Sequence, residues 1–344
     1  MGLVEPTDRT VMSLDHPSTK PHDRLSEALS ADLAEVNALI RTRMSSEHAP
    51  RIPEVTAHLI EAGGKRLRPM LTLASARMMG YAGDDHIKLA ATVEFIHTAT
   101  LLHDDVVDES EARRGRPTAN LLWDNQSSVL VGDYLFARSF QLMVETGSLR
   151  VLDILSNAAA TIAEGEVLQL TVARNLETSE ATYLKVVRGK TAALFSAAME
   201  VGGEIAGATP DEIKALWTYG DALGVAFQIV DDLLDYGGVG TVMGKNTGDD
   251  FRERKMSLPL IKALANADAK ERDFWTRVIQ NGDQRDGDLE HAQSLMRMHG
   301  ALEDTRSEAV AWTEKARLAL AQLPDHKLRH MLDDLADYVV ARTL

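Results

Sequence analysis

The chain has 344 residues, with 37 lysines and arginines against 52 aspartates and glutamates, which gives a formal net charge of −15. This length allows a large domain with a sizeable core. The acidic balance argues against generic binding to nucleic acid, so we expect no nucleic-acid partner. The chain contains no cysteine, which excludes disulfides, thiolate zinc sites and cysteine nucleophiles.

The N-terminal residues differ from the rest of the chain. Pro6, Pro17 and Pro21 lie among polar residues without periodicity, which predicts a flexible extension over 1–25. The apolar stretch of a secretory signal is missing there, and several acids argue against a transit peptide. No run of eighteen apolar residues predicts a membrane-spanning helix. We therefore expect a soluble cytoplasmic protein whose folded domain spans 26–344.

The rest of the chain has the pattern of helices. Apolar residues recur three and four positions apart from Leu29 onward, and alternating β-branched runs are scarce. Similar patterns predict helices over 87–108, 127–145, 149–172, 179–206, 211–236 and 255–264. No change of composition marks a second domain, so the predicted fold class is a single all-α domain. The C-terminal third, about 265–344, is charged and helical but carries no motif that indicates a function.

Two apolar helical runs end in the same motif, Asp-Asp-x-x-Asp. The two triplets are Asp104, Asp105 and Asp108, and Asp231, Asp232 and Asp235. Helical positions i and i+4 share a face, so the carboxylates of each triplet project together. Such carboxylates either point at water or bind a hard cation, and Mg²⁺ accepts both carboxylate and phosphate oxygens. A lone triplet is weak evidence, but the repeat favours two facing helices that hold several Mg²⁺ ions and a diphosphate.

Basic residues gather near these motifs. Lys65, Arg66 and Arg68 follow a Gly-Gly turn, where backbone amides can approach an anion and arginine offers two parallel donors to phosphate. A basic loop beside an acidic surface is the alternative interpretation. Further candidates are Arg113, Arg114, Lys190, Thr191, Lys245 and Lys255. His97 and Gln228 share the helix faces of the two triplets. A lone histidine on a helix is usually structural, but the shared face makes His97 a candidate ligand contact as well.

Six segments identify a known family. GGKRLRP, LLHDDVVDESEARRGRPTAN, VGDYLFA, GKTAALF, FQIVDDLLDY and GKNTGDDFRERKMSLPL follow in this order across 63–260. Together they resemble the trans-prenyltransferases (all-E polyprenyl diphosphate synthases), and most closely the long-chain bacterial members that make octaprenyl or decaprenyl diphosphate for ubiquinone. The resemblance implies one bundle of mostly antiparallel helices around a deep central cavity, usually as a homodimer. We also expect transient membrane contact when the apolar product leaves.

The resemblance also implies a role for each candidate residue. The metal ligands would be Asp104, Asp105, Asp108, Asp231, Asp232 and Asp235. Isopentenyl diphosphate would be bound by Lys65, Arg68, His97 and Arg114. The allylic diphosphate would be bound by Arg113, Lys190, Thr191, Gln228, Lys245 and Lys255. The residues expected to act in catalysis are Asp104, Asp105, Asp108, Lys190, Asp231, Asp232 and Lys245. Asn120 and Ser257 stand where many relatives have His and Thr, and we expect neither to affect the metal or the diphosphates.

The implied reaction ionises an allylic diphosphate, after which the double bond of isopentenyl diphosphate attacks the cation and the released diphosphate takes a proton. Ala99 lies five residues before Asp104, about 7.5 Å along a helix. Its small side chain would leave the product tunnel open and favour a long product, and Ala99→Phe would shorten it. The alternative is that Ala99 packs against a neighbouring helix.

Three other functions share part of this pattern. A shorter-chain synthase, making farnesyl or geranylgeranyl diphosphate, would have the same motifs. A terpene synthase is disfavoured by the complete second triplet and by the basic residues for a second diphosphate, Lys65 and Arg68. A non-catalytic subunit of a heteromeric prenyltransferase is disfavoured because both triplets are intact. The sequence alone leaves the exact product length and the preferred primer open.

Overall fold

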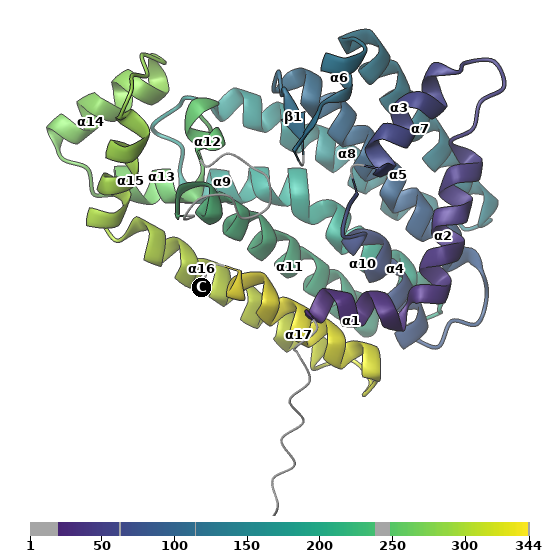
Figure 1. Ribbon diagram of the computed structural model, residues 1–344. Coiled ribbons are helices and arrows are strands. Elements are labelled where there is room, and N and C mark those ends of the chain that lie inside the picture. The colour runs from purple at the N-terminus through teal and green to yellow at the C-terminus, as the bar shows by residue number, and fades with distance from the viewer. Residues whose placement is uncertain (1–19, 62, 114, 238–247, 343–344) are drawn as a thin grey trace, which may run out of the picture.

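The computed structural model describes residues 20–61, 63–113, 115–237 and 248–342. Within these residues the chain is almost entirely helical, which confirms the predicted all-α class (Figure 1). The first half contains α1 (Pro21–Ala28), α2 (Ser30–Arg43), α3 (Arg51–Glu61), α4 (Leu67–Met78), α5 (Asp85–Val107), α6 (Ala119–Leu122), α7 (Asn125–Glu145) and α8 (Leu149–Val172). Two-residue strands β1 (Ala112–Arg113) and β2 (Arg116–Pro117) pair antiparallel between α5 and α6.

The second half continues the bundle. It contains α9 (Glu180–Val187), the π-helix η1 (Arg188–Ala192), α10 (Ala193–Ile205), α11 (Pro210–Gly237), α12 (Asp249–Arg252), α13 (Leu258–Ala265), α14 (Ala269–Trp275), the π-helix η2 (Thr276–Gln280), α15 (Asp288–Met298), α16 (Ala301–Leu320) and α17 (Lys327–Ala341). The long helices expected over 87–108, 127–145, 149–172 and 211–236 are present within one or two residues of those bounds. The helix expected over 179–206 is interrupted by η1.

Local sequence signals explain where several helices begin and end. The side chains of Asp124 and Ser148 accept hydrogen bonds from backbone amides in the first turns of α7 and α8, which are typical N-caps. Gly147 and Gly207 have φ of +69°, a conformation that suits glycine and ends α7 and α10. These turns join long helices closely, so their apolar faces pack against one another.

The N-terminal boundary differs from the prediction. The first helix begins at Pro21, and Leu25 on it is fully buried. Proline at a first helical turn is favourable because it lacks only an amide that has no helical partner there. The extension predicted over 1–25 therefore overlaps the first helix from Pro21 onward. Residues 1–19 lie outside the described part of the chain.

Helix α10 is central to the packing. It contacts α4, α5, α8 and α11, and its side chains from Leu194 to Met199 are buried. Helices α16 and α17 cover α11 along its length, and α1 lies beside α17 (Figure 1). Arg24 of α1 pairs with Asp334 of α17 at 2.7 Å, so the two ends of the described chain meet. The core is thus continuous from the first helix to the last.

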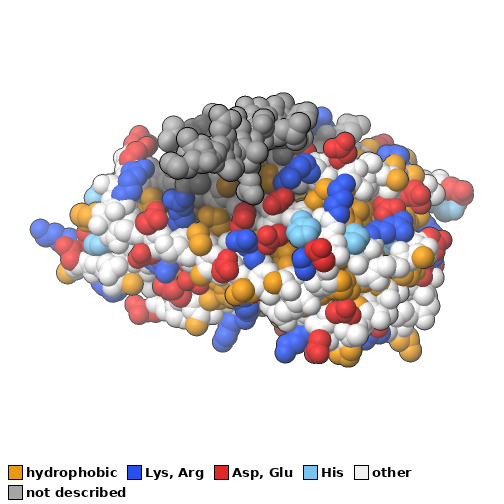
Figure 2. Space-filling view, turned by 90° about the horizontal axis from the view of Figure 1, so that it is seen from below, with side chains coloured by type: hydrophobic (Ala, Val, Ile, Leu, Met, Phe, Trp, Pro, Cys, Tyr) orange, Lys and Arg blue, Asp and Glu red, His pale blue; other side chains and the backbone are white. Residues whose placement is uncertain are grey.

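The surface of the described residues carries mixed charge. On the face in Figure 2, basic and acidic side chains are interspersed with hydrophobic ones. None of the helices within the described residues combines the length and the apolar character needed to span a bilayer.

Candidate active site

The first aspartate triplet lies where α5 ends. Asp108 follows the last helical residue with helical φ and ψ of −84° and −1°, and its amide donates to the carbonyl of Asp104 at 2.8 Å. Asp104 and Asp108 therefore share a face, as the spacing predicts. Asp105 is fully buried and pairs with Arg113 of β1 at 2.7 Å. Burial raises the pKa of Asp105, while the charge of Arg113 opposes that rise.

A lysine and a glutamate lie beside Asp104. The Nζ of Lys190 is 2.9 Å from Oε2 of Glu166 and 3.9 Å from Oδ2 of Asp104. Burial raises the pKa of both carboxyl groups, and the charge of Lys190 opposes the rise in each. No sequence motif indicates a role for Glu166, which lies on α8 in a stretch with the usual spacing of a helix. Its position makes it a fourth carboxylate near the first triplet.

The backbone brings Lys190 to this place through a π-helix. In η1 the amide of Ala193 donates to the carbonyl of Arg188, five residues earlier. Gly165 of α8 and Gly189 of η1 touch, and a Cβ on Gly165 would lie 2.6 Å from the amide nitrogen of Lys190. Only glycine allows two backbones to approach so closely. The wider turn and the close contact together fix Lys190, a residue whose apolar neighbours alone would suggest a packed helix.

Asp231 and Asp232 of the second triplet have different surroundings. Asp231 pairs with Arg342, the residue after α17, at 2.9 Å. Asp232 is buried, accepts from the hydroxyl of Tyr183 at 2.6 Å and accepts from the amide of Gln228 at 2.8 Å. Burial raises the pKa of Asp232 to about 6, although both hydrogen bonds favour its ionised form. Asp231 is thus tied to the C-terminal helix, and Asp232 to α9.

Asp235, the third member, accepts hydrogen bonds from backbone amides at the start of α12. Its carboxylate oxygens lie 3.2, 3.2 and 3.0 Å from the amides of Gly248, Asp249 and Asp250. Beyond α12, Lys255 extends its Nζ to 3.4 Å from Oδ2 of Asp108. Burial opposes charge on Lys255, but the surrounding carboxylates, Asp108 first, raise its pKa above the ordinary value. Lys255 therefore connects the second motif region with the first.

A second connection between the motifs passes through η1. The hydroxyl of Thr191 donates to the side-chain carbonyl of Gln228 at 2.8 Å, and Gln228 in turn donates to Asp232. Lys190 and Thr191 are neighbours, so one short segment contacts both motifs. The structure thereby brings together most of the residues expected to bind an allylic diphosphate. Lys245, another of them, lies outside the described residues.

The residues expected for isopentenyl diphosphate lie near the start of α4. The Nη1 of Arg68 is 3.1 Å from Nε2 of His97, and its guanidinium lies 4.5 Å from the ring centre of Phe195. Burial lowers the pKa of Lys65, and the charge of Arg342 lowers it further. Lys65 is thus close to the C-terminal helix, whose sequence carries no motif that indicates a function. Arg114, the fourth expected residue, lies outside the described residues.

Three further predicted positions can be located. Ala99 is fully buried in the core. Asn120 donates to the backbone carbonyl of Asp105 at 3.3 Å, so it contacts the first motif, and the expectation that it affects neither the metal nor the diphosphates stays a prediction. Its side chain supports the backbone of that motif from α6, a contact that spacing alone does not reveal. Ser257 is buried immediately before α13.

The carboxylate oxygens suit Mg²⁺, a hard cation. Among the described residues, no three acidic or histidine side chains already surround one point as a metal cage would. Asp104, Asp105 and Asp108 instead lie beside Lys190, Arg113 and Lys255, respectively. One oxygen of Asp105 and one of Glu166 are buried and lack a hydrogen-bond partner within the described residues. A site with these acceptors and this surplus of carboxylate fits a divalent cation.

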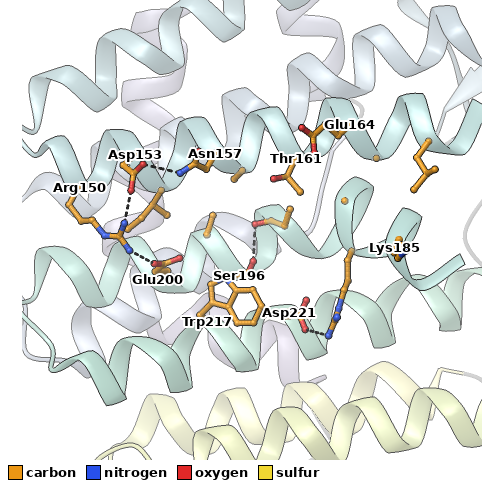
Figure 3. A pocket seen from close by; sticks show the side chains of 18 residues that line it. Arg150, Asp153, Asn157, Thr161, Glu164, Lys185, Ser196, Glu200, Trp217 and Asp221 are labelled. Atoms are coloured by element: carbon orange, nitrogen blue, oxygen red, sulfur yellow. Dashed lines mark hydrogen bonds and ion pairs between the residues drawn. The ribbon is translucent and has the colours of Figure 1, made fainter. Parts of the chain in front are cut away.

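A separate cleft of about 500 Å³ lies between α8, α10 and α11 (Figure 3). Arg150 pairs there with Asp153 at 2.5 Å and with Glu200 at 3.2 Å. The lining residues within the described chain include none of the six motif aspartates. This cleft is therefore distinct from the candidate active site, and the deep central cavity implied by the resemblance stays a prediction.

A helical bundle with two Asp-Asp-x-x-Asp helices whose aspartates pair with basic side chains is typical of a class of enzymes that handle diphosphates. The family profile described as Polyprenyl synthetase matches residues 49–296. The chain therefore belongs to the polyprenyl synthetase family.

Individual relatives agree with this assignment. The octaprenyl diphosphate synthase of Escherichia coli is 45% identical over 320 residues, which cover 93% of this chain and 98% of that protein. A crystal structure of a decaprenyl diphosphate synthase from Rhodobacter capsulatus is 74% identical, with a TM-score of 0.92 over 94% of this chain and 100% of that one. A polyprenyl synthase from Caulobacter crescentus, complexed with calcium and isoprenyl diphosphate, is 50% identical, with a TM-score of 0.91 over 96% and 100%.

Proposed function

We propose that this chain is a Mg²⁺-dependent long-chain synthase that adds isopentenyl diphosphate repeatedly to an allylic prenyl diphosphate. The product would be an all-trans octaprenyl to decaprenyl diphosphate, and its use would be the ubiquinone side chain. The observation that carries the proposal is the pair of aspartate motifs linked by Lys190, Thr191 and Lys255. The names of the similar octaprenyl and decaprenyl synthases support the long product. We also propose a cytoplasmic location.

The residues of the site suggest how the reaction would proceed. Asp104, Asp108 and Asp231 pair in the structure with Lys190, Lys255 and Arg342, and these carboxylates would hold Mg²⁺ instead. The bound ions would offset the negative charge that develops on the departing diphosphate. Lys190 and Lys255, released from those carboxylates, would donate hydrogen bonds to the allylic diphosphate. The buried apolar residues on α5 and α10 would exclude water from the allylic cation.

The second substrate would bind beside the first. Lys65 and Arg68 lie at the start of α4, where Arg68 contacts His97 and is held over the ring of Phe195. These residues would hold the diphosphate of isopentenyl diphosphate and aim its double bond at the cation. We assign proton removal to the released diphosphate, which ionisation of the allylic substrate itself supplies beside the cation.

Replacing the first motif tests the metal assignment. Asp104→Ala and Asp108→Ala should each lower turnover by roughly a thousandfold, because they remove oxygens that stabilise charge in the transition state. Incorporation of labelled isopentenyl diphosphate measures this, and calorimetric titration of Mg²⁺ with the allylic substrate gives an independent affinity. Glu303→Ala removes an exposed carboxylate from α16 and serves as the control. Undiminished turnover in the Asp104 variant would refute the assignment.

The same assay separates the alternative functions. A terpene synthase would consume farnesyl diphosphate alone, and a non-catalytic subunit would turn over nothing by itself. A shorter-chain synthase would stop at farnesyl or geranylgeranyl diphosphate. Chromatography of the dephosphorylated products with geranyl, farnesyl and geranylgeranyl primers therefore decides both product length and primer.

Lys65→Ala and Arg68→Ala should raise the KM for isopentenyl diphosphate by about tenfold or more and affect the allylic KM less.

We further propose that the chain forms a homodimer through α7 and α8. Large hydrophobic side chains on one side of this helix pair are exposed, and we call them the α7–α8 face: Leu130, Phe140, Val144, Leu149, Val167 and Leu170. Leu149 is 83% exposed and Leu130 is 66% exposed. A monomer rarely leaves such a group in water, and a second copy of the chain offers a matching surface.

A further inference from the structure

The turn before α4 has an unusual backbone. Arg66, the residue that precedes the helix, has φ of 49° and ψ of 31°, which is the left-handed conformation. Residues other than glycine adopt it rarely, and they keep it only when the surroundings hold it in place. The carbonyl of Arg66 nevertheless accepts the first helical hydrogen bond of α4, from Met70 at 3.0 Å. The direction of α4 therefore depends on this one turn.

A buried acid holds Arg66. The Nη1 of Arg66 pairs with Oε1 of Glu94, which projects from the middle of α5. Only 18% of the Arg66 side chain and 9% of the Glu94 side chain are exposed. The residues on either side of Glu94, Val93 and Phe95, are fully buried. The glutamate is thus fixed by the core, and its charge is matched by a single arginine.

The pair lies next to the proposed binding site for isopentenyl diphosphate. Glu94 and His97 are three residues apart on α5, so they share a face at a rise of about 4.5 Å. Arg66 contacts the first and Arg68 contacts the second. Two parallel contacts therefore tie the turn to α5, one on each side of Leu67. Lys65 precedes the left-handed residue directly, so the turn also sets where Lys65 points.

We propose that Arg66 and Glu94 are positioning residues, a partly buried ion pair that fixes the left-handed turn and thereby places Lys65 and Arg68 for the second diphosphate. The inference rests on the proposed function, because it assumes that Lys65 and Arg68 bind isopentenyl diphosphate. Arg66 directs its charge at a buried carboxylate of the protein. Its guanidinium does not bind the substrate.

The test begins with Glu94→Gln, which keeps the shape of the side chain and removes its charge. The KM for isopentenyl diphosphate should rise by about tenfold, because the turn is no longer fixed, whereas the allylic KM and kcat should change by less than about twofold. Steady-state kinetics with each substrate varied in turn measures the split. An equal change in both KM values, or none in either, would overturn the proposal.

A double-mutant cycle separates positioning from direct binding. Arg66→Gly accepts the positive φ but removes the pair. If the two residues act as one unit, the double variant should have the same KM for isopentenyl diphosphate as the single variant with the higher KM. If Arg66 touched the diphosphate, its substitution would raise the KM again in the Glu94→Gln background, and the proposal would fail.

Two controls complete the experiment. Asp32→Asn breaks the pair between α2 and Arg77 of α4, which measures 2.7 Å, and should lower the melting temperature while leaving the KM for isopentenyl diphosphate unchanged. Lys65→Ala and Arg68→Ala distinguish an error in the proposed binding site from an error in the positioning role. If they leave the KM for isopentenyl diphosphate unchanged, the proposed site is wrong. If they raise it and Glu94→Gln does not, only the positioning role is wrong.

Discussion

Ala99 lies five residues before Asp104 on α5, and its side chain has no exposed surface. A small residue at this position has two consequences. It leaves room along the expected path of a growing prenyl chain, and it packs closely with its neighbours in the core. A larger side chain must therefore either enter the path of the product or displace the packing. The two effects are measured separately as product length and as thermal stability.

We predict that Ala99→Phe shortens the product. The added ring would block elongation beneath the first motif, at a cost to stability of about 1–3 kcal/mol from overpacking. Product chromatography gives the length, and thermal unfolding gives the stability. Ala90→Phe is the matched control, since Ala90 is equally buried on α5 but lies on the opposite side of the helix. If both variants lose stability and both keep the long product, Ala99 is a packing residue only.

At the residue scale the repeated motif predicted the enzyme family, but not the surroundings of each aspartate. Both triplets have the same spacing, yet their members differ in the structure. Asp232 accepts hydrogen bonds from the side chains of Tyr183 and Gln228, whereas Asp235 accepts hydrogen bonds from backbone amides at the start of α12. Tyr183 lies 49 residues from Asp232 in the chain, and no local pattern connects them. Such pairings follow from how distant helices pack, which a linear motif does not contain.

At the scale of elements, helical periodicity located the long helices because each must bury one apolar face. The same periodicity does not predict the π-helix η1. Lys190 and Thr191 occur within an apolar run, and the π-helix that turns them towards the motifs changes the backbone without changing the pattern. The C-terminal helix α17 likewise has no motif that predicts its place beside the second triplet. It ends beside Asp231 through Arg342, whose side chain is only 10% exposed, although the two residues are 111 positions apart.

The contact between α8 and η1 leads to a prediction about Gly165. In Gly165→Ala the new Cβ would lie 2.6 Å from the amide nitrogen of Lys190 and 2.7 Å from the carbonyl carbon of Gly189. The two segments must separate, which moves Lys190 away from Asp104 and Glu166. We expect the allylic KM to rise by about tenfold and the free energy of unfolding to fall by about 1–3 kcal/mol.

Gly202→Ala is the control for this prediction. Its Cβ would lie 2.6 Å from the carbonyl oxygen of Thr72, so it forces α10 from α4 rather than η1 from α8. It should lower the free energy of unfolding to a similar extent, as urea unfolding would measure, and leave the allylic KM near that of the unaltered enzyme. A rise of the allylic KM in both variants would show that general loosening, not the position of η1, causes the effect.

At the scale of the whole molecule, the two ends of the described chain close the bundle. Helix α1 packs on α17, and the ion pair between Arg24 and Asp334 crosses that contact. Because α17 also leads to Arg342 beside Asp231, the last helix connects the N-terminal region with the second motif. The α7–α8 face belongs to a different part of the molecule. A partner bound there would therefore leave the closure of the chain ends undisturbed.

The final prediction concerns that face. Each of its large side chains would gain about 1.5–3 kcal/mol on full burial, so several together can hold two copies of the chain in a stable dimer. Leu130→Glu combined with Val144→Glu places two like charges in the α7 half of the face, and burying them unpaired is costly. We expect the unaltered protein to sediment with the mass of two chains and the double variant with the mass of one.

The control places the same change on another surface. Leu318 on α16 is 61% exposed, comparable with Leu130 and Val144, but lies outside the α7–α8 face. Leu318→Glu should therefore sediment as the unaltered protein does. If Leu318→Glu dissociates the dimer and the α7 variant does not, the interface lies along α16. If the unaltered protein sediments as a single chain throughout the micromolar range, the dimer proposal is wrong, and the exposed leucines and valines of α7 and α8 require another explanation.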